Sequence, residues 1–490
     1  MWLLEWRHTV LVAWAASWGC GLLPADAVLG ECAAAVSGAP MGELPNFVIF
    51  MTDDQDAMSV KVMRSVDDEI GRKGVTFRES FVTTPLCCPA RASALRGQYA
   101  HNHGVLTNGR PEGGWPSFHG SGAEQSTLAT WLQDAGYRTA LVGKYLNLYP
   151  DGDSVIVPPG WSEWYALSTT GREGTDYYGF TIIANGVERQ YGSRMDEYQT
   201  DVLADLAVDV VRRAAVDSRP FFLWIAPYAP HLPATPAPRH QGTFASLRVQ
   251  RPPSFGEDNV SDKPEWIQHR KAFSASVGNY LDNVHRSRLE TLLSVDDMVS
   301  AVIGALEQGD LDAETYVLFT SDNGFHIGEH RLLTGKSTSY EESIRVPLLV
   351  RGPGVMRDCT RDELVANIDL APTVAELAGV DVPSFVDGRS FVRLLRHSPM
   401  AGHSWRRRLL IENWWQHDGV GFETFAVRSR THTYVEWSTG EVELYDLNSD
   451  PYQLNNLSGR WIESVTAEMS TSLNELRECR GEACRVAENR

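Results

Sequence analysis

The sequence Cys87-Cys88-Pro89-Ala90-Arg91 places two cysteines directly before a proline and an arginine. Proline suits the first turn of a helix, and good helix formers follow it as far as Leu95. The start of a helix carries free N–H groups and a partial positive charge, so it binds anions. Arg91 adds a planar guanidinium that donates to an anion through two N–H groups. The pattern predicts an anion site beside Cys87; a disulfide between the neighbouring cysteines and a reactive thiol are the alternatives.

Two pairs of oxygen-bearing side chains follow apolar, strand-like runs: Asp53-Asp54 and Asp322-Asn323. Carboxylate and amide oxygens suit Ca²⁺ or Mg²⁺, whereas zinc prefers nitrogen and sulfur ligands. A capped turn or a solvated loop is the alternative for either pair taken alone. Because both pairs come at the end of such a run, the sequence predicts a site for a hard divalent cation.

Strand-like runs alternate with helical patterns through the first part of the chain. The strand-like runs are residues 46–51, 138–143, 220–228, 315–324 and 346–354. The helical patterns are residues 126–136, 200–214 and 288–309. This alternation, with near-continuous apolar strands, predicts an α/β fold in which helices cover both faces of a mostly parallel sheet. Ligands of such sheets bind at the carboxyl ends of the strands, which groups the polar residues after the runs: Asp53, Asp54, His231, Asp322 and Asn323.

The pattern changes after residue 396, where shorter runs are typical of antiparallel strands joined by short turns: residues 407–415, 424–438 and 440–451. A terminal helix is expected from Glu463 to Arg477. We therefore predict a catalytic domain over residues 45–396 and a smaller α+β subdomain, containing an antiparallel sheet, over residues 397–490.

The N-terminal segment has the features of an export signal. Arg7 precedes an apolar run, and Ala25-Asp26-Ala27 has the small–x–small form of a cleavage site. We predict a signal peptide over residues 1–27, cleaved after Ala27, a loose segment over residues 28–44, and an exported protein in a secreted, periplasmic or lysosome-like location. An uncleaved membrane anchor and a lipid on Cys20 are the alternatives.

Charge and cysteine usage narrow the function further. The 490 residues carry a formal net charge of −19, so the chain is not a general nucleic-acid binder. No basic run indicates an anionic membrane partner. Exported proteins can hold disulfides, and a bridge between Cys479 and Cys484 would hold the C-terminal tail.

Cys87-Cys88-Pro89-Ala90-Arg91 resembles the Cys-x-Pro-[Ser/Ala]-Arg signature of sulfatases. Three further segments resemble parts of that family. Residues 136–147 resemble its second signature, and residues 443–457 resemble its C-terminal subdomain. Residues 321–354 resemble its second metal-ligand segment and the sulfate-binding lysine that follows it. The resemblance covers residues 45–485 and is closest to the N-acetylglucosamine-6-sulfatase branch. It implies an alkaline-phosphatase-like fold with a large mixed sheet.

The resemblance implies that Cys87 is oxidised to formylglycine by a formylglycine-generating enzyme, with Pro89 and Arg91 in the recognition sequence and Cys88 in a variable position. It also implies a Ca²⁺ ion bound by residue 87 and by oxygen ligands from four residues: Asp53, Asp54, Asp322 and Asn323. The hydrated aldehyde would attack the sulfur of a sulfated sugar or aryl sulfate, expel the alcohol and then eliminate sulfate.

Further roles follow from the same resemblance. Lys144 and Lys336 would bind the sulfate oxygens, and Arg91 would orient the hydrated aldehyde. His231 would protonate the leaving alcohol.

One position departs from many arylsulfatases, which carry a histidine three residues after the first lysine. This chain has Asn147 there, as does the N-acetylglucosamine-6-sulfatase branch, and the base for sulfate elimination is left unassigned. His326 is our candidate, with a supporting role outside the reaction as the alternative. His101 and His103 are expected to be packing or loop residues near the site.

Other functions are compatible with parts of this pattern. An arylsulfatase of broad specificity and a phosphonate monoester or phosphodiester hydrolase share the fold, which alone does not decide function. A non-catalytic protein that binds sulfated glycans is the alternative outside enzymes. The pattern of two lysines and two histidines favours sulfate monoesters over the phosphonate and phosphodiester alternatives. The intact cysteine motif and the complete set of oxygen ligands oppose a non-catalytic protein.

Overall fold

The computed structural model describes residues 32, 44–152, 155–169, 176–396, 405–417, 420–459 and 463–490. The predicted signal peptide, its cleavage after Ala27, and Cys20 lie outside these residues, as does nearly all of the predicted loose segment 28–44. None of the described helices is both long enough and apolar enough to cross a bilayer.

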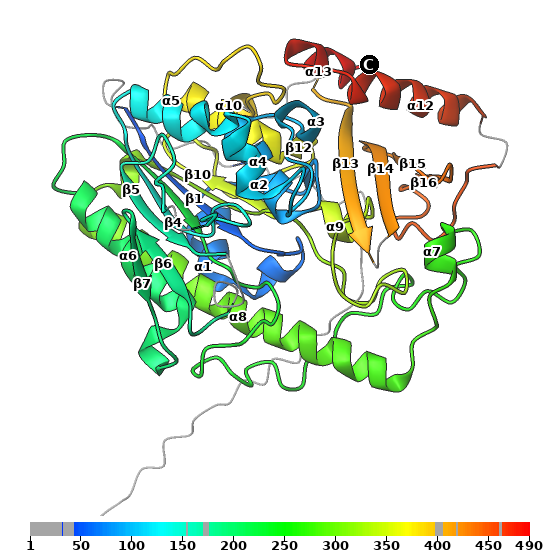
Figure 1. Ribbon diagram of the computed structural model, residues 1–490, viewed down its shortest axis with the longest axis horizontal. Helices are drawn as coiled ribbons and strands as arrows, with labels where there is room; N and C mark the ends of the chain where they lie inside the picture. The colour runs from blue at the N-terminus through cyan, green and yellow to red at the C-terminus, as the bar shows by residue number, and fades with distance from the viewer. Residues whose placement is uncertain are drawn as a thin grey trace, which may run out of the picture.

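Ten strands of the described chain form one sheet in the order β11-β2-β10-β9-β1-β8-β4-β5-β6-β7 (Figure 1). In that order they are Cys359–Arg361, Val75–Phe77, Leu348–Arg351, Thr315–Ser321, Asn46–Thr52, Phe221–Ala226, Arg138–Gly143, Glu163–Leu167, Thr181–Ala184 and Val187–Gln190. The central strands β9, β1, β8, β4 and β5 are parallel, whereas β10 and β6 pair antiparallel with their neighbours. The prediction of a large, mixed, mostly parallel sheet is confirmed.

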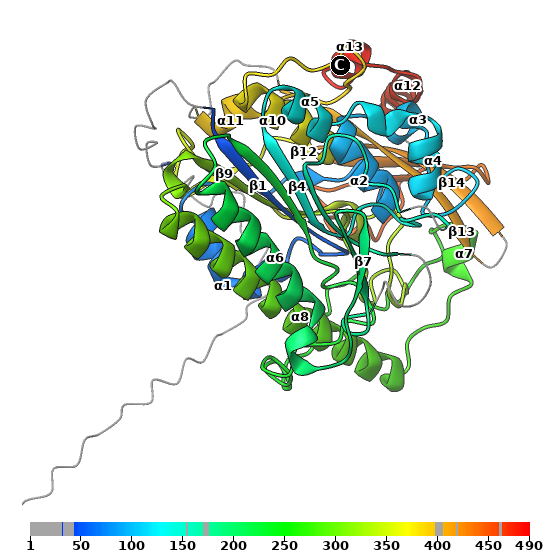
Figure 2. The same cartoon turned by 60° about the vertical axis from the view of Figure 1, so that its left-hand side comes forward.

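Helices cover both faces of this sheet (Figure 2). One face packs against α6 (Gln199–Ala214) and α8 (Ala275–Gln308), and the other against α2 (Cys87–Arg96), α5 (Leu128–Asp134) and α10 (Leu370–Leu377). A central strand therefore meets apolar side chains on both sides. This is why β1, with the sequence NFVIFMT, is buried at every residue.

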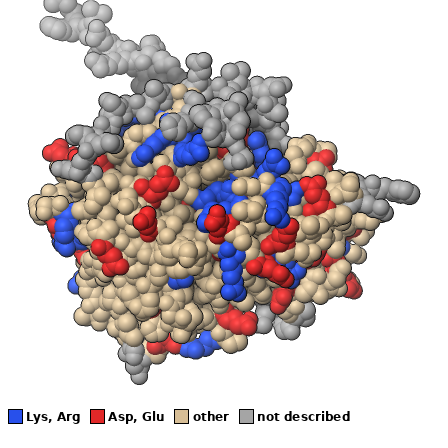
Figure 3. Space-filling model, turned by 90° about the horizontal axis from the view of Figure 1, so that it is seen from above, with Lys and Arg blue, Asp and Glu red and all other residues tan. Residues whose placement is uncertain are grey.

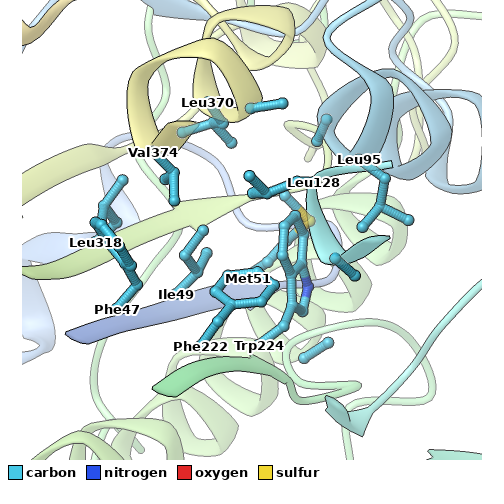
Figure 4. Packing of buried hydrophobic residues seen from close by; sticks show 14 of the residues in the cluster. Phe47, Ile49, Met51, Leu95, Leu128, Phe222, Trp224, Leu318, Leu370 and Val374 are labelled. Carbon is cyan, nitrogen blue, oxygen red and sulfur yellow. The ribbon is translucent and has the colours of Figure 1, made fainter. Parts of the chain in front are cut away.

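Alternate residues of β1 enter the two cores. Phe47, Ile49 and Met51 point to the face of α2, α5 and α10, and Val48 and Phe50 belong to the core under α6 and α8. Figure 4 shows the first of these cores, where side chains of β1, β8 and β9 meet residues of the helices above them. Because these two cores hold the central strands from both faces, they fix where the carboxyl ends of those strands lie.

Short α-helices join these elements: α1 Arg64–Val66, α3 Ala100–His103, α4 Gly114–Gly120, α7 Glu265–Gln268, α9 Glu341–Ile344 and α11 Val392–Arg396. A two-strand sheet joins β3 (Ser80–Phe81) to β12 (Val365–Ala366). The long helix α8 begins at Ala275, whereas the sequence predicted its start at residue 288. Ser274 caps it by accepting a hydrogen bond from Val277 N at 3.4 Å.

A second, antiparallel sheet lies in the C-terminal part, with the strand order β13-β14-β15-β16. Its strands are Arg408–His417, Val420–Ser429, His432–Trp437 and Val442–Asp446. α12 spans Glu463–Arg477, the bounds expected from the sequence, and α13 spans Glu482–Ala487. The core of this sheet includes Phe81, Tyr99 and Ile344 from the larger part of the chain, so the two sheets share a packed boundary. The division at residue 396 stays a prediction.

Two disulfides lie within the described residues. Cys479 bonds to Cys484, which is the pairing expected from the sequence. Cys32 bonds to Cys359 at the start of β11, a pairing that the sequence did not predict. The second bridge ties Cys32, which precedes the central strand β1, to the edge strand β11. Disulfides persist in oxidising compartments, so both bridges agree with export.

Candidate active site

The carboxyl ends of four neighbouring parallel strands, β9, β1, β8 and β4, meet at one edge of the large sheet. β1 and β9 pair in register through Thr52 and Ser321, so Asp53 and Asp322 leave the sheet side by side. The backbone N–H of Asp54 donates to Asp322 Oδ1 at 3.0 Å. The sheet thus brings together acidic residues that lie far apart in the sequence.

The turn after β1 directs two carboxylates toward the same point. Asp54 has a φ of 66°, a left-handed conformation that costs free energy for a residue with a side chain. Its neighbour Gln55 is held by a hydrogen bond from its backbone N–H to Ser321 Oγ at 2.9 Å. As a result the Cys87 thiol lies 3.4 Å from Asp53 Oδ1 and 3.9 Å from Asp54 Oδ1.

Cys87 is the first residue of α2. Leu86 precedes it in an extended conformation, and the second backbone N–H of the helix, that of Cys88, donates to Asn108 Oδ1 at 2.8 Å. Both cysteines are free thiols and are buried. The sequence prediction of a helix that begins at this motif agrees with the structure, and the helix N-terminus faces the carboxylates.

Basic side chains compensate the carboxylates. Arg91 donates from Nε to Asp322 Oδ2 at 2.8 Å and from Nη1 to the Lys144 carbonyl at 3.0 Å. The Lys144 ammonium contacts Asp53, and the Lys336 ammonium contacts Asp54 and lies 2.7 Å from Cys87 Sγ. The structure therefore gathers side chains of both signs around Cys87: the buried Asp53, Asp54, Asp322, Arg91 and Lys144, and the half-buried Lys336.

These neighbours set the protonation of the site. Burial alone would raise the pKa of Asp53, but Lys144 and the other nearby cations hold it well below its usual range. Burial and the adjacent Asp53 raise the pKa of Asp322 to about 6. Burial, reinforced by Asp53, raises the pKa of the Cys87 thiol to about 12. An unmodified Cys87 is therefore a neutral thiol at physiological pH and a poor nucleophile.

His231 follows β8 and faces the acidic cluster. Its Nδ1 is 2.7 Å from the Leu232 carbonyl, a contact in which Nδ1–H donates, so Nε2 is the nitrogen that lies 3.5 Å from Asp54 Oδ2. The side chain is 27% exposed, so a ligand can reach it. Burial lowers the pKa of His231, and the neighbouring carboxylates oppose that shift.

His326 lies in a different contact environment. Its Nε2 is 2.7 Å from Thr338 Oγ1, and its buried Nδ1 has no hydrogen-bond partner within the described residues. Burial lowers the pKa of His326 to about 4. Its backbone N–H donates to Gly335 O, next to Lys336. The structure thus places His326 beside the site without a described contact to Cys87, and its role as the eliminating base stays a prediction.

His101 and His103 have partners outside the acidic cluster. The two ring nitrogens of His101 lie 2.7 Å from Glu412 Oε1 and 3.0 Å from the Cys479 carbonyl. His103 Nε2 is 2.9 Å from Ser93 Oγ. These contacts link α3 to the C-terminal part and to α2, as packing residues would.

The site can accommodate a cation. Ligand atoms of Asp53, Asp54, Cys87 and His231 all lie within 4.8 Å of one another. Asn323 Oδ1 is buried without a donor among the described residues, so an acceptor is left for a positive group. Hard oxygen donors of this kind suit Ca²⁺. Asp322 was expected in this set, and in the structure its two oxygens accept from Arg91 and from the Asp54 backbone.

A cavity of 730 Å³ opens at Leu86 and Lys336, which adjoin Cys87 in the chain and through the Lys336 ammonium. The part next to the acidic cluster is lined by Leu86, Asn108, His326 and Lys336. The part farther out is lined by residues of the four-stranded antiparallel sheet, among them Trp414. The cavity provides the space for a ligand larger than a sulfate group.

Comparison with known proteins agrees with this geometry. The family model described as Sulfatase matches residues 45–380. The chain belongs to the sulfatase family. A second model, N-sulphoglucosamine sulphohydrolase, C-terminal, matches residues 328–479. This sulfatase is accordingly a sulfuric ester hydrolase, and the resemblance seen in its motifs is confirmed.

Individual relatives cover nearly the whole sulfatase. The N-acetylglucosamine-6-sulfatase of Capra hircus is 36% identical over 92% of this chain and 87% of its own. A structure solved with the substrate D-glucosamine-2-N,6-O-disulfate has a TM-score of 0.73 at 23% identity, covering 91% of this chain and 99% of that one. The structure of the phosphonate monoester hydrolase of Silicibacter pomeroyi has a TM-score of 0.72 at 20% identity, covering 89% of this chain and 96% of that one. At these identities the two structures support the fold alone.

Arg288 of α8 is a site-supporting residue that the sequence did not reveal. Its guanidinium is buried and lies 3.9 Å from the centre of the Phe325 ring. Nη1 donates to the Pro230 carbonyl at 3.0 Å, and Nη2 donates to the Asp54 carbonyl. One side chain therefore connects the turn that carries Asp54 with the loop that carries His231.

We expect Arg288→Met to lower kcat/KM for sulfate esters about 100-fold, because methionine fills the space but leaves the Asp54 and Pro230 carbonyls unpaired and both loops less well placed. Steady-state kinetics on an aryl sulfate measures the loss. Arg286→Met is the matched control, since Arg286 on the same helix bonds to Leu247 O and Asn283 instead. Wild-type kinetics in Arg288→Met would show that this bridge does not position the site.

Proposed function

We propose that this sulfatase hydrolyses sulfate monoesters of sugars and that its substrate resembles N-acetylglucosamine 6-sulfate. The observation that carries the proposal is the position of Cys87, which begins a helix and contacts two carboxylates and the Lys336 ammonium at once. The 36% identity with the N-acetylglucosamine-6-sulfatase of Capra hircus supports the choice of this sugar as the substrate.

We further propose that Cys87 is used as formylglycine and that Ca²⁺ is bound beside it. Oxygens of Asp53, Asp54, Asp322 and Asn323, together with residue 87, would hold the ion. Formylglycine supplies a hydrated aldehyde with two hydroxyls, which a thiol with a pKa of about 12 does not provide. Ca²⁺ supplies positive charge that acidifies a hydroxyl and offsets charge on sulfate oxygens.

The chain's own cations bind the sulfate group. Lys336 and Lys144 both lie at the carboxylates beside residue 87. Their neighbours raise the pKa of each lysine, against the opposing effect of burial, so both stay charged. Fixed ammonium groups in a buried site stabilise the charge that develops on sulfate oxygens more than water does. Arg91 holds Asp322 and the Lys144 backbone in place.

His231 would donate the proton to the leaving alcohol. Its Nδ1–H is fixed on the Leu232 carbonyl, so Nε2 is the nitrogen that faces the site and would take up and donate the proton. Sugar alcohols are basic leaving groups, and a general acid typically contributes about 10²–10⁴-fold to such a step. His326, with an unpaired Nδ1, would accept a proton later in the cycle, through water, since no described contact joins it to residue 87.

The proposed location is outside the cytosol. The disulfides Cys32–Cys359 and Cys479–Cys484 support it, because disulfides persist in oxidising compartments. A cleaved signal peptide and a formylglycine-generating partner enzyme belong to the same proposal.

The first test is the state of residue 87. We expect a peptide containing it to weigh less than the thiol form by the difference between a –CH₂SH and a –CHO side chain, measured by mass spectrometry of the folded protein. Cys87→Ser should abolish turnover, because serine has one hydroxyl where the hydrated aldehyde has two. Cys88→Ser is the control and should retain most activity. Repeated turnovers by Cys87→Ser would refute the proposal that an aldehyde at residue 87 is needed for turnover.

Calcium binding is tested by removing one ligand charge. We expect stoichiometric calcium in the purified protein and its loss in Asp54→Asn, because the ion then loses an anionic ligand. Elemental analysis measures this directly. Asp56→Asn is the matched control, since Asp56 accepts from the backbone of Met58 and Ser59. Stoichiometric zinc, or full activity after chelation, would contradict the assignment.

Variants of His231 and His326 should slow different steps of the reaction. His231→Ala should slow release of the alcohol, and more for sugar sulfates than for aryl sulfates, because phenols leave with little help from an acid. His326→Ala should leave that release fast and slow the regeneration of free enzyme, which gives a burst of alcohol before a slow steady rate. Rapid-mixing kinetics on both substrate types measures each step. A shared leaving-group dependence without a burst would reject this division.

A further inference from the structure

The cavity beside Lys336 extends well beyond the space of a sulfate group. Its 730 Å³ falls within the range of about 300–1,000 Å³ that is typical of small-ligand sites. One end is formed by Leu86 and Lys336, which adjoin Cys87, and the rest by α7, the loop after α3 and the small antiparallel sheet. A ligand whose sulfate reaches Cys87 therefore has room for further atoms in this direction.

Aromatic rings form much of the outer wall. Trp266 on α7 packs against Phe422 on β14 and Trp437 on β15, with ring centroids 6.3 and 5.8 Å apart. Trp414 on β13 lines the cavity as well and packs edge-on against Phe425 at 5.5 Å. Each ring is supported by a neighbour, so the wall is rigid before a ligand arrives.

Polar groups accompany these rings. Asn413, next to Trp414, lines the cavity and is 1% exposed. Its Nδ2 donates to the Ser337 carbonyl at 2.6 Å, which fixes the amide, while Oδ1 has no donor among the described residues. A buried acceptor without a donor costs free energy, and a ligand O–H or N–H would remove that cost. Thr107, Ser337 and Thr338 also line the cavity.

We propose that this wall binds a second sugar ring, the one joined to the sulfated residue, and that Asn413 orients it. A pyranose presents an apolar C–H face, which packs on an aromatic ring, and hydroxyl edges, which donate hydrogen bonds. The cavity offers both kinds of partner, Trp414 for the face and Asn413 Oδ1 for an edge. The preferred substrate is then an oligosaccharide, and the C-terminal sheet determines the preference. This inference rests on the proposed sulfatase function.

Binding is measured in a Cys87→Ala background, which prevents turnover, by calorimetric titration. The probes are N-acetylglucosamine 6-sulfate and a disaccharide that carries this residue at its non-reducing end. We expect the disaccharide to bind about tenfold more tightly. Trp414→Ala should remove most of that advantage and affect the monosaccharide far less, Asn413→Ala should reduce it, and Trp414→Phe should keep it. Tyr280→Ala, which removes a 49% exposed aromatic side chain from α8, is the control.

The outcomes separate the two proposals. Equal affinity for the two probes, or an equal loss for both in Trp414→Ala, would overturn the second-ring site and leave the sulfatase function standing. If neither probe binds and the wild-type enzyme desulfates neither, the sugar substrate is wrong and the second-ring site falls with it. Retained circular dichroism and an unchanged melting temperature in Trp414→Ala show that a loss of affinity comes from the cavity.

Discussion

The burial of neighbouring carboxylates at the ends of β1 and β9 is the constraint on which the rest of the structure depends. Asp53, Asp54 and Asp322 lie within a few residues of two paired strands, and each is nearly or fully removed from water. Charges in such a place are stable when opposite charges and hydrogen bonds surround them. Arg91 on α2 and Lys144 after β4 supply these opposite charges. The three carboxylates therefore fix the position of the start of α2 and of the end of β4.

The same constraint explains why the strained and buried features gather at this edge. The left-handed Asp54 and the buried Arg288 serve one purpose, which is to hold the turn after β1 against the loop after β8. The two cores on either side of the sheet supply the favourable free energy that compensates them. A site of this kind is preorganised, since its groups need little movement to act.

The sequence predicted the central sheet and most of the acidic cluster, because buried parallel strands are continuous apolar runs and their carboxyl ends share one edge. It did not predict the N-terminal part of α8, since residues 275–287 are mostly exposed or half-buried and most of their side chains are polar or small. Arg288 and the Cys32–Cys359 bridge were missed for another reason. Their partners lie far away in the chain, and no local pattern encodes a contact made by the fold.

Cys87 is 1% exposed, is part of a helix, and lies under the Lys336 ammonium. Under the proposal that residue 87 is used as formylglycine, the oxidising enzyme must draw this segment into its own catalytic centre, which the finished fold prevents. Conversion and folding would then compete during biosynthesis, and their order would decide the outcome. A molecule that folds first would keep its thiol and reach the native shape without the proposed nucleophile. The active fraction of a preparation would thus record the speed of maturation in the producing cell.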